Sequence, residues 1–92
     1  MRRKRARRGS AFSELQLIRL SELNVGATAR IVSFHGGRGF RERMNGMGLF
    51  PGIDIKLVQT GGSGGMMLIS VGGSRIMVCS RNAGRILLRK MS

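Results

Sequence analysis

The feature that most constrains the fold is a glycine-rich corner at residues 44–52, Met-Asn-Gly-Met-Gly-Leu-Phe-Pro-Gly. Before it, Phe40, Met44 and Met47 recur at i, i+4 and i+7, which predicts an apolar stripe on a helix of about two turns. After it, residues 53–57 alternate apolar and polar side chains, the period of a half-buried strand. The chain therefore has to turn from helix into strand within a few residues.

Glycine and proline supply the backbone conformations that such a corner needs. Gly46 and Gly48 can adopt the left-handed conformation that ends a helix. The pair Pro51-Gly52 predicts a type II turn, in which proline sets one dihedral and glycine accepts the positive one. The corner is then either a helix cap and a turn only, which the local residues favour, or an apolar surface presented to a partner.

Outside the helix and the corner, most of residues 27–89 read as short strands separated by turns, in the single domain that a chain of 92 residues allows. We expect strands at 27–35, 53–60, 66–71, 74–79 and 85–89. In the first strand, Ala29 and Ile31 share one face and Phe34 lies on the other. Gly72-Gly73 predicts a type I′ hairpin, residues 61–65 a flexible loop, and Ser80 a cap for one helical turn. These patterns predict a mainly β fold, a small SH3-like barrel of about five strands with one short helical insert; an oligonucleotide-binding barrel is the alternative.

Residues 13–19 form a lead-in whose structure the sequence leaves open. Ser13 and Gln16 have the spacing of a capping box, which would start a short helix. Leu15 and Leu17 instead alternate as in a strand. The turn that follows, residues 21–26, should direct Leu20 and Leu23 inward.

The N-terminal residues 1–12 carry much of the net charge of +13. A segment with so many like charges repels itself, so we expect disorder. It would bind polyanions non-specifically, or serve only as a solvated tail. The candidate polyanion-binding residues are Arg2, Arg3, Lys4, Arg5, Arg7 and Arg8.

Composition excludes several classes of site and protein. The single cysteine excludes an intramolecular disulfide and a four-cysteine zinc site. No apolar run approaches the roughly 20 residues that span a bilayer, and no apolar region follows the basic start as it would in a secretory signal. We therefore expect a protein that is not itself transmembrane, and the single cysteine suits a reducing compartment.

No catalytic set emerges from the reactive residues. His35 is the only histidine, Cys79 follows an apolar strand pattern and is expected to be packed, and the four acidic residues are scattered. We therefore predict that the protein is not an enzyme and holds no resident cofactor. A weak transition-metal site for an ion such as ferrous iron would have to use His35, because methionine thioethers suit copper(I) better and lie here at core-like spacing. Neither a dinucleotide-binding nor a P-loop motif occurs, so the chain should not bind GTP itself.

Five segments together resemble the FeoA-like domain family: residues 20–26, 29–31, 36–37, 76–88 and, most specifically, 44–52. The resemblance covers residues 19–92, and we place the domain at 13–92. It implies an SH3-like barrel and a small cytosolic accessory of bacterial ferrous iron uptake. It also implies a partner, the large ferrous iron permease, whose cytoplasmic part carries a GTP-binding domain, and a location at the inner face of the membrane. Similar domains occur in iron-dependent repressors.

The corner and the preceding loop are the predicted partner surface. Leu49 and Phe50 would supply apolar contacts if they are exposed, and nearby arginines would steer an acidic partner. The candidate partner-binding residues are Arg38, Phe40, Arg41, Arg43, Met47, Gly48, Leu49, Phe50, Pro51 and Gly52. Two alternatives stay open at this point: a basic nucleic-acid-binding barrel and a metal-sensing domain.

Overall fold

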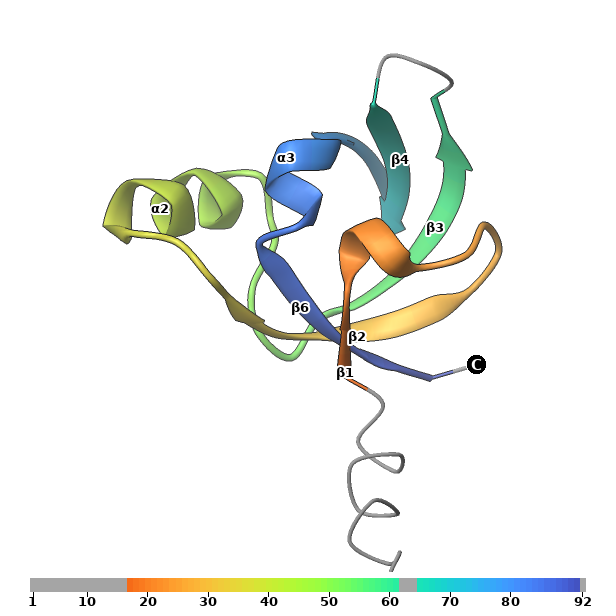
Figure 1. Ribbon diagram of the computed structural model, residues 1–92, viewed down its shortest axis with the longest axis horizontal. Helices are drawn as coiled ribbons and strands as arrows, with labels where there is room; N and C mark the ends of the chain where they lie inside the picture. The colour runs from red at the N-terminus through yellow and green to blue at the C-terminus, as the bar shows by residue number, and fades with distance from the viewer. Residues whose placement is uncertain (1–16, 62–64, 92) are drawn as a thin grey trace, which may run out of the picture.

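The computed structural model describes residues 17–61 and 65–91. These residues form one antiparallel sheet in the order β1-β6-β2-β3-β4-β5, curled into a small barrel (Figure 1). In chain order the elements are β1 Leu17–Arg19, the 3-10 turn η1 Leu20–Glu22, β2 Thr28–Phe34, α2 Arg38–Gly46, β3 Asp54–Thr60, β4 Met66–Val71, β5 Ser74–Cys79, α3 Ser80–Ala83 and β6 Ile86–Lys90. The predicted mainly β, SH3-like barrel is confirmed, with six strands in place of about five.

The additional strand is β1, which pairs antiparallel with β6, Leu17 opposite Arg89. The strand alternative for the lead-in is therefore right for the part of it that the structure describes. Its three residues are too few for periodicity to identify. The predicted arginine-rich segment 1–12, the capping box at 13–16 and the central part of the 61–65 loop lie outside the described residues.

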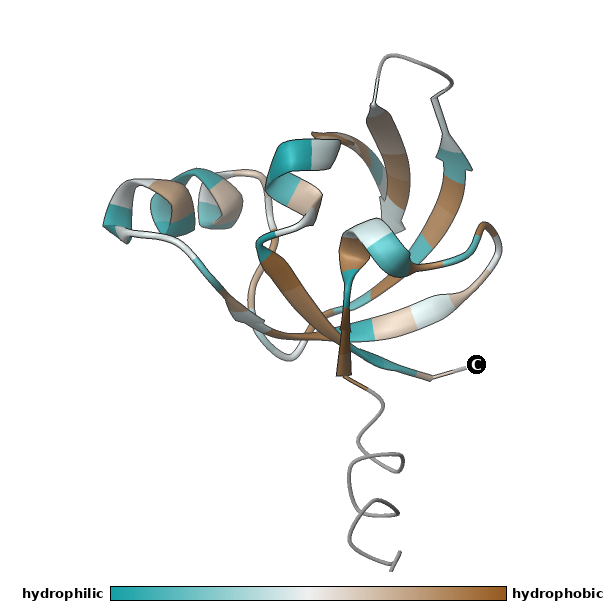
Figure 2. Cartoon of the chain, viewed as in Figure 1, coloured by the Kyte–Doolittle hydropathy of each residue, from teal (hydrophilic) through white to brown (hydrophobic). Residues whose placement is uncertain are grey.

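The core is built mostly from aliphatic side chains of the sheet and of the segments that cover it. Hydrophobic residues run along β4 and β6, whereas α2 mixes hydrophobic and polar residues (Figure 2). Leu20 and Leu23 are buried, as predicted for the turn that holds them. The strand residues with 0% exposure are Ala29, Leu57, Ile69, Ile86 and Leu88.

A β-bulge changes the face to which Phe34 belongs. The pairing of β2 with β6 shifts register between Ile31 and Ser33, so one extra residue enters β2. An extra residue reverses the alternation beyond it. Phe34 is therefore buried with Ile31, and its predicted place on the opposite face was wrong.

Two turns also differ from their predictions. In the β4–β5 hairpin only Gly72 has a positive φ, of 59°, so the turn has the type II′ pattern and not the predicted type I′. At α3, Ser80 is the first helical residue, and the N-cap is Cys79, whose side chain makes no capping hydrogen bond. α3 packs against η1, β4 and β5, where it covers one end of the barrel (Figure 1).

Candidate functional site

Helix α2 projects beside the barrel and is anchored by two residues of the predicted stripe (Figure 1). Phe40 and Met44 are 4% and 1% exposed. The ring of Phe40 meets that of Phe34 edge-on, with centroids 6.0 Å apart and an angle of 84° between the planes. Met47 is 37% exposed, because α2 ends at Gly46 before the third position of the stripe can turn inward. The helix is thus fixed at its middle and exposed at its C-terminal end.

The corner after α2 is fixed by backbone conformation and by main-chain hydrogen bonds. Gly48 and Gly52 have φ values of 89° and 95°, whereas Gly46 stays helical, so only the second of the two predicted helix-ending glycines is left-handed. The Leu49 amide donates to the Met44 carbonyl at 3.0 Å, which ties the corner to the helix. The Gly52 amide donates to the carbonyl of Ile31 in β2 at 2.7 Å, which ties it to the sheet.

The structure divides the predicted partner surface into an exposed part and a supporting part. Phe50 is 43% exposed, and Pro51 and Gly52 are exposed beside it. Leu49 is fully buried, so it does not meet the condition of exposure on which its predicted surface contact depended. Phe40 is likewise a core residue. Phe40 is buried as its place on the helical stripe indicates, whereas Leu49 lies in a turn without periodicity, where its place in the sequence does not show its burial.

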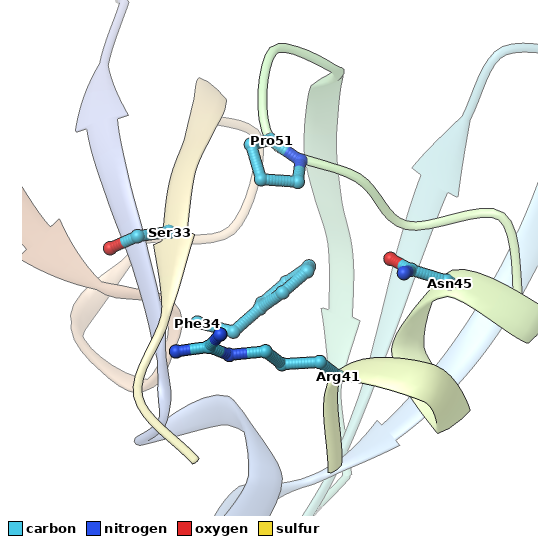
Figure 3. Close-up of a pocket in the computed structure, with 5 residues that line it drawn as sticks. All are labelled: Ser33, Phe34, Arg41, Asn45 and Pro51. Atoms are coloured by element: carbon cyan, nitrogen blue, oxygen red, sulfur yellow. The ribbon is translucent and has the colours of Figure 1, made fainter. Parts of the chain in front are cut away.

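An open cleft of about 360 Å³ lies between β2, α2 and the corner. In Figure 3, Phe34 and Arg41 extend across it, Pro51 and Asn45 stand on two of its sides, and the Ser33 hydroxyl points away. The cleft therefore combines an aromatic surface with one exposed guanidinium.

The arginines of α2 are exposed, and none of them has a carboxylate partner among the residues that the structure describes. Within residues 17–61 and 65–91, the one ion pair joins Arg30 and Asp54, elsewhere on the sheet. Arg43 instead lies over the Phe40 ring, its guanidinium carbon 5.9 Å from the centroid. Arg85 does the same at 5.6 Å.

Arg85 is the residue that sequence reasoning missed. Its backbone carbonyl accepts a hydrogen bond of 2.7 Å from the His35 amide, which brings the start of β6 beside the end of β2. No local pattern could have revealed this contact, because His35 and Arg85 are far apart in the chain. The result is a basic surface with contributions from two separate segments.

The described residues offer few groups for chemistry. Among them no cluster of three or more His, Cys, Asp or Glu side chains could hold a metal ion. His35 is exposed at the end of β2, and Cys79 is half-buried at the end of β5, a strand that is not a neighbour of β2 in the sheet. The weak His35 site stays a prediction. No helix in the described part of the chain has the length and hydrophobicity to cross a membrane.

Comparison with known protein families identifies the family of this chain. Residues 18–90 match the family model of the FeoA domain. The chain belongs to the FeoA domain family. No curated protein matches its sequence.

Solved FeoA structures share both fold and sequence with this chain. The crystal structure of an iron uptake regulatory protein (FeoA) is 35% identical, covers 82% of this chain and 99% of its own, and superposes with a TM-score of 0.75. Iron(II) transport protein A from Clostridium thermocellum is 30% identical over 80% of this chain and 46% of its own, with a TM-score of 0.76. A manganese-dependent transcriptional repressor, 12% identical with a TM-score of 0.76, shares the fold alone; the match covers 82% of this chain and 42% of the repressor.

Proposed function

We propose that this FeoA-family protein is a non-enzymatic accessory of ferrous iron uptake that binds the cytoplasmic, GTP-binding part of the ferrous iron permease. Similarity to proteins named for iron uptake regulation and iron(II) transport supports the iron role. The observation that carries the binding proposal is an exposed apolar corner beside an arginine-lined cleft.

The binding surface that we propose, called the corner surface, comprises Met47, Phe50, Pro51 and the adjoining cleft. Phe50 projects from a rigid support, because the buried side chain of Leu49 precedes it and Gly52 is hydrogen-bonded to β2. Aromatic, methionine and arginine side chains are enriched in protein interfaces, and rigid aromatic anchors carry much of the binding energy. Arg41 would meet acidic groups of the partner and accelerate encounter.

The decisive experiment measures binding of the purified permease cytoplasmic domain to two variants. Phe50→Ser removes the aromatic anchor and should weaken binding by about 2 kcal/mol, roughly 30-fold in Kd. Arg41→Glu reverses the charge in the cleft, so it should slow association and reduce its dependence on salt. Titration calorimetry and surface-binding kinetics give the two readouts.

Matched controls separate a local effect from general loss of apolar or basic surface. Val25→Ser removes an exposed apolar side chain, 58% accessible, from the turn before β2. Arg75→Glu reverses a charge on the outer strand β5. Both should bind as the wild type does. A folded Phe50→Ser variant with unchanged affinity would remove the corner surface from the proposal.

The exposure of the aromatic side chains supports a protein partner over a nucleic acid. Phe34 and Phe40 pack against each other in the core. Among the phenylalanines that the structure describes, only Phe50 is exposed, which leaves one platform where base stacking ordinarily uses several. Salt-sensitive retention of RNA or DNA by a chain lacking residues 1–12 would favour the nucleic-acid alternative instead.

A further inference from the structure

The outer face of β4 and β5 brings together three sulfur-bearing side chains. Met66 lies directly opposite Cys79 in the ladder, and Leu68 lies opposite Met77. Directly opposed residues project to the same face, with Cβ atoms about 4.5–5.5 Å apart, and diagonal neighbours are about 7–8 Å apart. The intervening residues Met67 and Val78 are buried in the core. Met66, Met77 and Cys79 therefore share the opposite, outward face.

These side chains are accessible without being fully exposed. Met77 is 51% exposed, and Met66 and Cys79 are half-buried. A hollow of about 90 Å³ adjoins the two methionines, lined by Gln59, Gly61, Met66, Leu68 and Met77. Cys79 is the chain's single cysteine, so no disulfide within the chain can consume its thiol.

The backbone around the three sulfur atoms is held by hydrogen bonds at the open end of the β4–β5 ladder. The Gly61 amide donates to the Met66 carbonyl at 2.6 Å, and the Ser80 amide donates to the Gly65 carbonyl at 2.5 Å. The Cα positions are thereby fixed, while each methionine keeps three side-chain torsions with which to place its sulfur. Diagonal separations of this size are within reach of such long side chains.

We propose that Met66, Met77 and Cys79 form a binding site for monovalent copper. One thiolate and two thioethers are soft ligands, which select Cu(I) over ferrous iron, whose preferred ligands are imidazole and carboxylate. Binding converts the Cys79 thiol and Cu(I) into a copper–thiolate bond with release of one proton, and no electron is transferred. The site is separate from the corner surface and does not depend on the proposed function.

The test is an anaerobic Cu(I) titration of the full chain, in ascorbate and against a colorimetric Cu(I) chelator. The wild type should take up one Cu(I) per chain, and X-ray absorption should show sulfur as the only nearest neighbour. Cys79→Ser should weaken Cu(I) binding by more than about 100-fold, which exceeds the loss caused by changes outside the ligand set. Met77→Leu should weaken it by about tenfold. Proton release on binding, measured in weakly buffered solution, should disappear in Cys79→Ser.

Methionines elsewhere on the surface provide the controls. Met47→Leu and Met91→Leu remove thioethers that are 37% and 49% exposed and lie outside β4 and β5, so both should bind Cu(I) as the wild type does. The proposal is overturned if the wild type leaves all copper with the chelator, if Cys79→Ser and Met77→Leu bind unchanged, or if nitrogen or oxygen neighbours dominate the absorption spectrum. Leucine preserves the volume of methionine closely, so the three methionine-to-leucine variants should remain folded.

Discussion

The corner surface and the outer face of β4 and β5 both expose apolar side chains, but the backbone beneath them is held in different ways. At the corner, two left-handed glycines and a few single hydrogen bonds place Phe50. On the outer face, six consecutive residue pairs of a regular ladder place Met66, Met77 and Cys79. The two regions lie at different sides of the barrel, α2 at the left and β4 at the right of Figure 1.

This difference implies unequal tolerance to substitution. In a regular ladder, the backbone hydrogen bonds of neighbouring pairs hold each strand in place. A cross-strand pair of side chains adds only about 0.2–1 kcal/mol. At the corner, each buried anchor and each special dihedral acts alone, so one change can displace the whole turn. Stability should therefore be sensitive to single residues at the corner and insensitive on the outer face.

The largest expected effect is that of Leu49→Ala. Leu49 is fully buried beneath the corner, so truncation leaves a cavity and should reduce the free energy of unfolding by about 2–5 kcal/mol. Met77→Ala removes an exposed side chain from the outer face and should change it by no more than about 0.5 kcal/mol. Urea denaturation followed by circular dichroism measures both. Equal effects of the two substitutions would show that the corner and the outer face of β4 and β5 tolerate substitution equally.

A smaller effect is expected from Gly52→Ala. Gly52 has a φ of 95°, and a Cβ there would meet nothing within 4 Å, so the cost is conformational and not steric. A left-handed alanine costs about 1–2 kcal/mol. Gly73→Ala is the matched control: it also has open space, but its φ lies outside the left-handed range, so the change in the free energy of unfolding should stay below about 1 kcal/mol. If the two variants were equally stable, the dihedral would not be what fixes the corner.

The contrast between the two regions also explains what the sequence could predict. Strand β4 and strand β5 have the predicted boundaries, because alternation and the Gly72-Gly73 turn are local signals. The bulge between Ile31 and Ser33, which buries Phe34, arises from how β2 pairs with β6, and no pattern within β2 predicts it.

At the candidate site, too, local features could be predicted from the sequence, whereas features that depend on tertiary contacts could not. The corner itself could be found from its glycines and proline, and Gly48 and Gly52 are left-handed as expected. Whether Leu49 or Phe50 faces solvent could not be found, since both are large apolar residues in a turn without periodicity. The contact of Arg85 with the Phe40 ring depends on the fold bringing β6 beside α2.

The smallest effect concerns the side-chain pair at the exit from the corner. Asp54 begins β3 and lies opposite Arg30 of β2 in the ladder. The Arg30 Nε donates to the Asp54 carboxylate at 2.7 Å. This hydrogen bond is the main reason why the pKa of Asp54 lies below its ordinary value, and it raises the pKa of Arg30. Both side chains are exposed, so solvent screens their attraction.

A depressed folded-state pKa fixes the sign of the pH dependence. The stabilisation from the pair is fully present above the unfolded-state pKa of Asp54, about 3.9, and is lost as the pH falls through the lower folded-state value. Asp54→Asn should therefore be slightly less stable than the wild type at neutral pH, and the difference should vanish in acid and shrink in high salt. Thermal unfolding of both proteins across that range measures it, with Glu42→Gln on α2 as a carboxylate control outside any ion pair of the described residues. A difference between wild type and Asp54→Asn that persists in acid would show that the ionised carboxylate is not its cause.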